Sequence, residues 1–152
     1  MAIADRLAEL GLTLPEVAAP AGAYVPAVVA DDLVFTAGQL PFLDGRLPRT
    51  GVLGADVGVD EAADLAAVCA LNGLAAVASV LGGLDRVVQV VKVTGFVASA
   101  PGFTEQPAVL NGASNLLVDL FGDDGRHARS AVGVAALPLG SPVEVELVVR
   151  FR

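Results

Sequence analysis

The clearest pattern in the chain is a strict alternation of apolar and polar positions near its C-terminus. Within residues 143–151, the odd-numbered positions are all apolar, whereas Glu144, Glu146 and Arg150 occupy even-numbered ones. Successive side chains of a strand point to opposite faces. The pattern therefore predicts a strand with one buried face and, on the other, two carboxylates about 7 Å apart. From spacing alone, those carboxylates are typical of a solvated outer face.

Two longer apolar segments predict helices. Residues 65–84 form a stretch of 20 residues without a charged side chain. A stretch of that length is long enough to span a membrane. Polar Asn72 and Ser79 interrupt this segment, and residues 86–98 directly after it predict a strand, so a buried helix is the better interpretation. Asp60 is placed to cap that helix, and the pair Gly82-Gly83 is placed to end it. Residues 107–121 predict a second helix.

Shorter patterns complete the order of elements. Residues 3–10 predict a short amphipathic helix, residues 24–29 and 33–36 two strands joined at Asp31-Asp32, and residues 130–136 a further strand. The strand at 86–98 is apolar on both parities in its first half, which is typical of a central strand covered on both faces. Residues 42–59 are rich in Gly, Pro and Asp and predict a long surface loop. We therefore expect one α+β domain over residues 1–152, with two helices on one face of a mixed sheet and residues 1–20 as an N-terminal helical extension and connector.

The amino-acid composition is unusually apolar for a small protein. Hydrophobic residues make up 55% of the chain and charged residues only 17%, and the mean hydropathy is +0.69. Such an apolar chain either buries surface against other subunits or enters a membrane. Because the apolar helix is better explained by burial, and because no basic, apolar leader opens the chain, we expect a cytoplasmic oligomer and no membrane.

Charge and cysteine content narrow the chemistry. The net charge is −8 and the nine basic residues are scattered, which argues against nucleic-acid binding. The single Cys69 allows no intrachain disulfide and is expected to be a small buried group. With one His and one Cys, no recognisable metal-ligand set is present, so we expect neither a metal nor a cofactor.

Four ordered segments resemble the RidA (YjgF-type) family. The stretch 129–138, Arg-Ser-Ala-Val-Gly-Val-Ala-Ala-Leu-Pro, leads to Val-Glu-Val-Glu at 143–146, which is similar to the family's C-terminal signature. Upstream, Gly-Ala-Tyr at 22–24 and Phe-Thr-Ala-Gly-Gln-Leu-Pro at 35–41 are similar to its Gly-x-Tyr and Thr-Ser-Gly-Gln segments. Asn111 stands where the family usually has an Asn. The resemblance covers about 130 residues, from Pro20 to Phe151.

This resemblance implies a chorismate-mutase-like α+β fold and a homotrimer in which three sheets line a central barrel, with clefts at the subunit interfaces. It also implies a metal-free deaminase that hydrolyses reactive 2-imino or enamine acids, such as 2-iminobutanoate and 2-iminopropanoate, to 2-keto acids and ammonia. The expected ligand is therefore a small carboxylated imine or keto acid.

The resemblance also assigns residues. Arg129 matches the arginine that binds the substrate carboxylate, and Glu144 matches the acidic residue near the attacking water. Tyr24 is expected to cover the ligand, and backbone groups around Gly38 to hold the ligand or the water. Asn111 is expected to act as a helix cap and loop holder, and a direct contact with the substrate is the alternative role at this position.

The sequence departs from the family at several positions. Ala37 replaces a common Ser, Ala131 a common Cys, and His127 a common Pro, and the loop at 42–59 is longer than usual. These departures are typical of a divergent branch of the family. Two alternatives to imine hydrolysis therefore stay open: a pathway-specific reaction on a larger carboxylated substrate, and a non-catalytic role in metabolite binding or partner regulation. The ribonuclease and translation-inhibitor labels of some family members fit this acidic chain least well.

Overall fold

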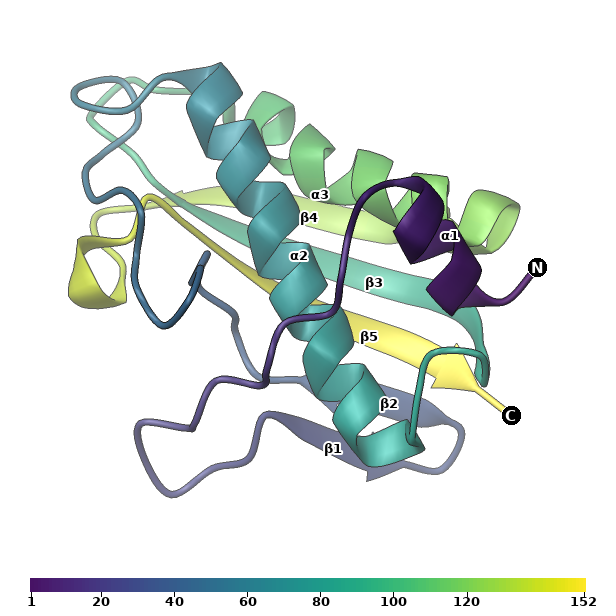
Figure 1. Ribbon diagram of the computed structural model, residues 1–152. Coiled ribbons are helices and arrows are strands. Elements are labelled where there is room, and N and C mark those ends of the chain that lie inside the picture. The colour runs from purple at the N-terminus through teal and green to yellow at the C-terminus, as the bar shows by residue number, and fades with distance from the viewer.

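Five strands form one sheet in the order β1-β2-β5-β3-β4 in the computed structural model, which describes all residues from 1 to 152 (Figure 1). The strands are β1 (Ala27–Ala30), β2 (Leu33–Thr36), β3 (Val87–Ala98), β4 (Ala128–Val134) and β5 (Val143–Phe151). Strands β3 and β4 are parallel, and the other neighbouring pairs are antiparallel. The predicted α+β class with a mixed sheet is confirmed.

Strand β5 lies at the centre of the sheet and has the predicted bounds and alternation. Its odd-numbered residues from Val143 to Val149 are buried, whereas Glu144, Glu146 and Val148 are only partly buried. The expectation that β3 is covered on both faces is wrong for the single chain. Only one of its faces, with Val93 and Val97, is fully buried under the helices.

Two helices, α2 (Val59–Leu81) and α3 (Gln106–Phe121), cover one face of the sheet (Figure 1). They cross closely, because a Cβ added at Gly112 of α3 would lie 1.8 Å from the Ala63 backbone oxygen of α2. By length and composition α2 is apolar enough to span a membrane, but 61% of its most apolar window is buried inside the domain. Cys69 lies in this buried part, as expected. Packing against the sheet therefore accounts for the apolarity of α2.

A third helix, α1 (Ile3–Glu9), packs beside α3 and ties the N-terminus to the C-terminus. The Arg6 Nε atom donates a hydrogen bond of 2.7 Å to the Asp119 carbonyl at the end of α3. The Ile3 amide donates to Asp85 Oδ1 at 3.0 Å, and Arg86 Nε donates to the Arg152 carbonyl at 2.9 Å. The short turn before β3 therefore holds both ends of the chain (Figure 1).

Several predicted element ends need correction. Helix α2 begins at Val59 with Gly58 as its N-cap, so Asp60 is not a cap, although its charge still favours the positive end of the helix dipole in the first turn. Strand β1 begins at Ala27, because Pro26 has no amide hydrogen to donate to the sheet. Strand β4 begins and ends two residues before the predicted 130–136. The loop at 42–59 is present, but Leu53 within it is fully buried rather than superficial.

The second face of the sheet has no helix over it. Residues that pair across neighbouring strands point to the same side of a sheet. Two cross-strand rows of three residues lie on this second face: Val28, Phe35 and Val148 in one row, and Glu144, Phe96 and Val132 in the other. Val28, Phe35 and Val132 are exposed by 51%, 44% and 44%. Clustered apolar exposure of this kind marks an interaction surface.

Candidate functional site

Glu144, the second residue of the central strand β5, lies beside a glycine that leaves room for its carboxylate. Backbone hydrogen bonds join the segment after β2 to β5: the Gln39 amide donates to the Val145 carbonyl at 2.8 Å, and the Val145 amide donates back at 3.0 Å. This bridge holds Gly38 against the Glu144 side chain. A Cβ at position 38 would lie 2.5 Å from Glu144 Oε1, so any larger residue there would displace the carboxylate.

These two residues border a cavity of about 290 Å³. Tyr24 and Ala37 also line it, and so does Leu139 from the turn before β5. The Tyr24 hydroxyl accepts a hydrogen bond of 3.3 Å from the Ala21 amide, and half of the Tyr24 side chain remains exposed. Three residues expected at the site, Tyr24, Gly38 and Glu144, are therefore brought together by the fold.

The Glu144 carboxyl has a raised pKa. Partial burial is the main cause, because it penalises the charged form, and the neighbouring negative charge of Glu146 adds to the effect. Both carboxylates lie on the uncovered face of β5, as the alternation predicted. A carboxyl group whose pKa is shifted toward neutrality exchanges protons with substrates more readily than an ordinary one.

We expect Glu146→Gln to move the acidic limb of the pH–rate profile to lower pH. A general base must be ionised, so turnover rises as pH increases through the pKa of Glu144. Removing the like charge at position 146 lowers that pKa. Measurement of kcat/KM from pH 4 to pH 8 tests this, with Asp31→Asn at the β1–β2 turn as a control for lost charge elsewhere. An unmoved or upward-shifted limb would contradict the role of Glu144 as the base.

Arg129 is held on the second residue of β4 by two side chains from α3. Its Nη1 atom donates to Asn111 Oδ1 at 2.9 Å and to Ser114 Oγ at 3.1 Å. Asn111 lies within α3 and is not a helix cap, which corrects the expectation. Sequence reasoning missed Ser114, although its spacing of three residues from Asn111 places both on one face of a helix. The Nε and Nη2 atoms of Arg129 donate to no acceptor of the chain, which leaves one edge of the guanidinium available to a carboxylate.

Within one chain the fold does not bring Arg129 to Glu144. Val93 pairs with Arg129 on β4 and with Leu147 on β5, and both Val93 and Leu147 are buried beneath the helices. Arg129 therefore belongs to the helix-covered face, whereas Glu144 points to the opposite face. Two strand spacings and three residues separate their Cα atoms, which amounts to about 14 Å. The expected site residues form two separate groups.

The residues that depart from the family pattern lie near both groups. Ala37 lines the Glu144 cavity directly. His127 is partly buried, and its Nδ1 atom lies 3.2 Å from the Ala128 carbonyl. Burial is the main reason that the pKa of His127 is lowered; the hydrogen bond to the Ala128 carbonyl opposes this shift, and the positive charge of Arg129 adds to it. Ala131 packs against the core beneath α3.

The arrangement as a whole offers acid–base and carboxylate-binding chemistry. The fully buried Cys69 has a pKa raised well above that of a free thiol, mainly because burial penalises the thiolate, so it is a poor nucleophile. No group of three or more His, Cys, Asp or Glu residues is arranged to hold a metal ion. The groups that remain are a carboxyl with a raised pKa, a phenol and an arginine with one free edge.

Comparison with known proteins identifies close relatives over the whole chain. Residues 4–151 match the family model described as "YjgF/chorismate_mutase-like, putative endoribonuclease". The Trypanosoma cruzi protein TCP17 is 48% identical over 99% of this chain and 94% of its own length. The structure of Atu1372 from Agrobacterium tumefaciens, a protein of unknown function, has a TM-score of 0.92 at 46% identity over 99% of this chain and 92% of that one. A Shewanella oneidensis structure described as that of "a putative endoribonuclease" has a TM-score of 0.96 at 36% identity over 99% and 100% of the two chains.

A more distant structure carries a ligand in its description. Escherichia coli TdcF "with bound serine" is 28% identical, with a TM-score of 0.59 over 92% of this chain and 96% of that one. The higher TM-scores of the Agrobacterium and Shewanella structures show that the chain follows their geometry more closely than that of TdcF. The family model and these matches cover nearly every residue, the two groups of site residues included. The chain therefore belongs to the YjgF (RidA-type) family.

Proposed function

We propose that this protein hydrolyses small 2-imino acids, and their enamine tautomers, to 2-keto acids and ammonia. The observation that carries the proposal is that one edge of the Arg129 guanidinium makes no hydrogen bond within the chain. Asn111 and Ser114 engage only its Nη1 atom, so the edge formed by Nε and Nη2 is available to grip a carboxylate with two hydrogen bonds. The serine in the description of TdcF, an amino acid with the same carboxylate, supports this ligand class.

Glu144 supplies the proton transfers in the proposed reaction. Water adds to the carbon of the protonated C=N bond while Glu144 takes one of its protons, and a neutral tetrahedral carbinolamine forms. Glu144 then returns that proton to nitrogen, the carbinolamine hydroxyl releases its own proton to solvent, and the C–N bond breaks, so that ammonia leaves as the carbonyl of the keto acid forms. The raised pKa of Glu144 suits a group that must accept a proton in one step and donate it in the next.

The proposed site needs a second copy of the chain. Arg129 and Glu144 lie on opposite faces of one sheet, so a small ligand can touch both only if one subunit provides Arg129 and its neighbour provides Glu144 with Tyr24 and Gly38. The uncovered apolar face, with Val28, Phe35 and Val132, supplies the surface for such an assembly. We propose a homotrimer with its ligand clefts at the subunit interfaces.

We expect light scattering to give a mass of about 46 kDa, three times the 15.3 kDa of one chain. The expected assembly persists at micromolar concentration, because the apolar sheet face would otherwise be exposed to water. A stable monomer would remove the shared cleft and with it the proposed site. As a further check, Phe35→Glu should weaken the assembly, since it places a charge in the proposed interface.

The function is tested by ammonia release from imines made in place. An amino-acid oxidase converts alanine or 2-aminobutyrate to its imine, and a serine dehydratase generates 2-aminoacrylate. Acceleration of ammonia release over the spontaneous rate supports the proposal, and Arg129→Ala and Glu144→Gln serve as inactive controls. Release at the spontaneous rate with all three imines contradicts it.

The family description and the Shewanella structure name an endoribonuclease. RNA is a polyanion, and the net charge of −8 on this chain opposes its binding. We therefore propose imine hydrolysis, and not RNA cleavage, as the main activity of the protein. Incubation of the same preparations with single-stranded RNA measures RNA cleavage directly, and cleavage that Glu144→Gln abolishes would reverse this conclusion.

A further inference from the structure

The wall of the cavity beside Glu144 is almost entirely apolar. Of the 14 residues that line this cavity, only Glu144, Tyr24 and Gln39 have polar side chains. No Lys, Arg or His lies among the rest, which are alanines, prolines and one glycine, together with Leu40, Phe42 and Leu139. A part of the ligand that extends beyond the reacting carbon therefore meets a surface with few hydrogen-bonding groups and no positive charge.

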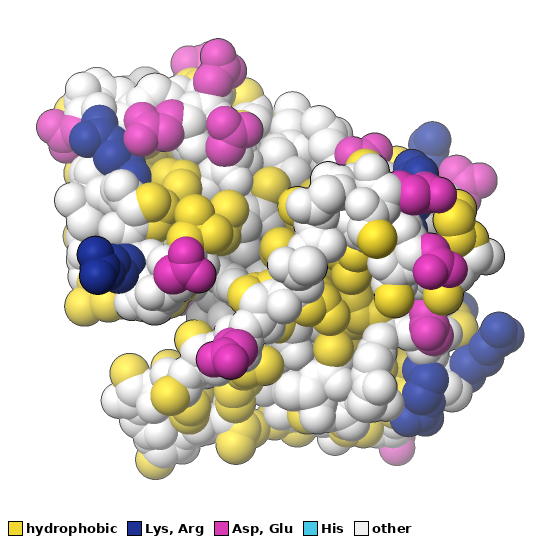
Figure 2. Space-filling model, viewed as in Figure 1, with side chains coloured by type: hydrophobic (Ala, Val, Ile, Leu, Met, Phe, Trp, Pro, Cys, Tyr) yellow, Lys and Arg dark blue, Asp and Glu magenta, His cyan; other side chains and the backbone are white.

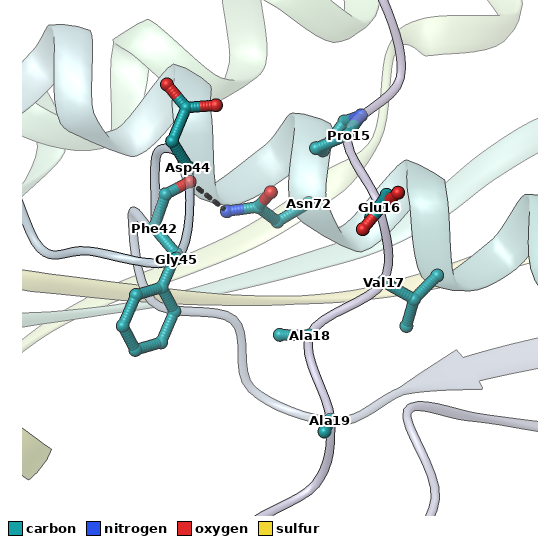
Figure 3. A pocket seen from close by; sticks show the side chains of 9 residues that line it. All are labelled: Pro15, Glu16, Val17, Ala18, Ala19, Phe42, Asp44, Gly45 and Asn72. Atoms are coloured by element: carbon teal, nitrogen blue, oxygen red, sulfur yellow. Dashed lines mark hydrogen bonds between the residues drawn. The ribbon is translucent and has the colours of Figure 1, made fainter.

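The N-terminal connector forms one side of this wall. Its contribution is the run Ala-Ala-Pro-Ala at 18–21, followed by Pro26. The prolines have no amide hydrogen, so they cannot donate a backbone hydrogen bond to a ligand. In Figure 3, Ala18 lies across from the ring of Phe42, which belongs to the loop after β2. In Figure 2, a hollow opens between the connector below it and the loops above it, and much of the connector surface is apolar.

Leu139 lines the cavity from the turn before β5 in an unusual backbone conformation. Its φ and ψ angles are 58° and 16°, which lie in the left-handed region. The other non-glycine residues with positive φ are Asp31 and Asp44, and Asp tolerates this region better than Leu does. Leu139 is also 71% exposed. A strained backbone and an exposed apolar side chain at one residue, beside a cavity, point to a contact with a ligand.

The turn that carries Leu139 is held from both sides. The Gly51 amide, in the long loop before α2, donates a hydrogen bond of 3.0 Å to the Gly140 carbonyl. On the other side, the buried Ser141 hydroxyl donates to the Val143 carbonyl at 2.8 Å. These contacts fix the backbone around Leu139 before any ligand binds, which lowers the entropy cost of a contact with its side chain.

We propose that this cavity binds the apolar side chain of the substrate, so that the preferred substrates are 2-imino acids with a branched aliphatic or aromatic side chain. The inference rests on the proposed function for the reacting group and concerns only the side chain, which contacts Phe42, Leu139 and the connector. The cavity volume of about 290 Å³ equals that of about ten molecules in liquid water. The six non-hydrogen atoms of 2-iminopropanoate fill only about half of it, which leaves room for a larger side chain. Ala37, where the family commonly has Ser, extends the apolar lining.

The preference is measured by calorimetry with three 2-keto acids. Pyruvate has a methyl side chain, 4-methyl-2-oxopentanoate has the branched side chain of leucine, and 2-oxosuccinamate has the same branched shape with a polar amide. We expect 4-methyl-2-oxopentanoate to bind about 10- to 60-fold more tightly than pyruvate, because each of its three additional carbon atoms contributes up to about fourfold when buried. The amide should bind no more tightly than pyruvate, since it finds few partners in the lining.

Leu139→Asn tests the assigned wall and preserves the turn. Asn has nearly the same shape as Leu and adopts the left-handed conformation more readily. Its amide should reduce the preference for 4-methyl-2-oxopentanoate over pyruvate about fivefold. Ala19→Asp, on the connector, should reduce the preference by at least as much, because a charge then lies beside the apolar side chain.

The matched control is Leu10→Asn at the C-cap of α1, which changes an exposed leucine outside the cavity lining and should keep the preference of the parent. Equal affinity of the parent for pyruvate and 4-methyl-2-oxopentanoate would overturn the inference. So would binding of 2-oxosuccinamate as tight as that of 4-methyl-2-oxopentanoate, or a preference that Leu139→Asn and Ala19→Asp both retain.

Ammonia release from the imines of leucine and alanine separates this inference from the proposed function. A higher kcat/KM for the leucine imine supports both. Acceleration of both imines with equal kcat/KM overturns the apolar subsite and leaves the imine hydrolase intact. Acceleration of neither imine, together with preferential binding of 4-methyl-2-oxopentanoate, supports the subsite and contradicts the hydrolase.

Discussion

Arg129→Ala should lose about 10- to 150-fold in affinity for a small 2-keto acid, because it removes a charge-assisted bidentate contact worth roughly 1.5–3 kcal/mol. The loss in kcat/KM for the imine should be larger, since a loosely held carboxylate also misplaces the imine carbon relative to the water. Arg129→Lys keeps the charge but not the planar fork, and should recover only part of the affinity. Calorimetry with pyruvate and 2-oxobutyrate gives the first quantity, and ammonia release gives the second.

One of the two side chains that hold Arg129 provides a graded control for this experiment. Ser114→Ala removes one of the two acceptors of the Nη1 atom and leaves Asn111 in place. This variant should show a smaller rise in KM than Arg129→Ala, with the guanidinium still present but less firmly oriented. Both variants should keep the oligomeric state of the parent. Undiminished keto-acid binding by Arg129→Ala would remove Arg129 from the site.

Glu144→Gln should separate binding from chemistry. The amide keeps the shape of the carboxyl and leaves the contacts of Arg129 intact, so keto-acid affinity should change little. Turnover should fall by about 100- to 10,000-fold, because the amide can neither take a proton from water nor return one to nitrogen. Rapid-mixing measurement of ammonia release on both proteins checks this. A variant that retains turnover would show that another group activates the water.

The same substitution should not destabilise the fold. Burial raises the pKa of Glu144 above its ordinary value of 4.5, so the folded state prefers the protonated form. Stability is therefore highest below that ordinary value and falls as pH rises from it through the raised pKa. Removing the charge should leave the Tm at pH 7 unchanged or higher. A clear fall in Tm would mean that the carboxylate makes stabilising contacts beyond those described.

Local periodicity predicted the central strand and the helices well. The alternation at residues 143–151 gave β5 its correct bounds, because one side of that strand is buried without interruption. The glycine pair ended α2 as expected, since Gly82 adopts the left-handed conformation that closes a helix. The start of α2 was misplaced because Asp60 has the preferred chemistry of a cap, whereas the backbone turns into the helix two residues earlier at Gly58.

The division of the site could not be read from the sequence. Arg129 and Glu144 are 15 residues apart in the sequence, on successive strands, and the order of the motifs gives no sign that they face opposite sides of the sheet. Their relation depends on the position of β3 between β4 and β5, and on the pairing of Val93 with Arg129 and Leu147. Such register is set by contacts between distant segments. Ser114 was missed for the same reason, because its role appears only once α3 lies beside β4.

The turn at Asp85 and Arg86, which binds both ends of the chain, makes this protein suitable for circular permutation. The Ile3 amide and the Arg152 carbonyl are both hydrogen-bonded to that turn, so a short Gly-Ser linker can join the natural ends without crossing the domain. New ends can then be opened at the exposed Asp44-Gly45 turn. Glu144 lies eight residues from Arg152 along β5, about 25 Å away, so a dye or affinity tag at either natural end stays remote from the Glu144 cavity.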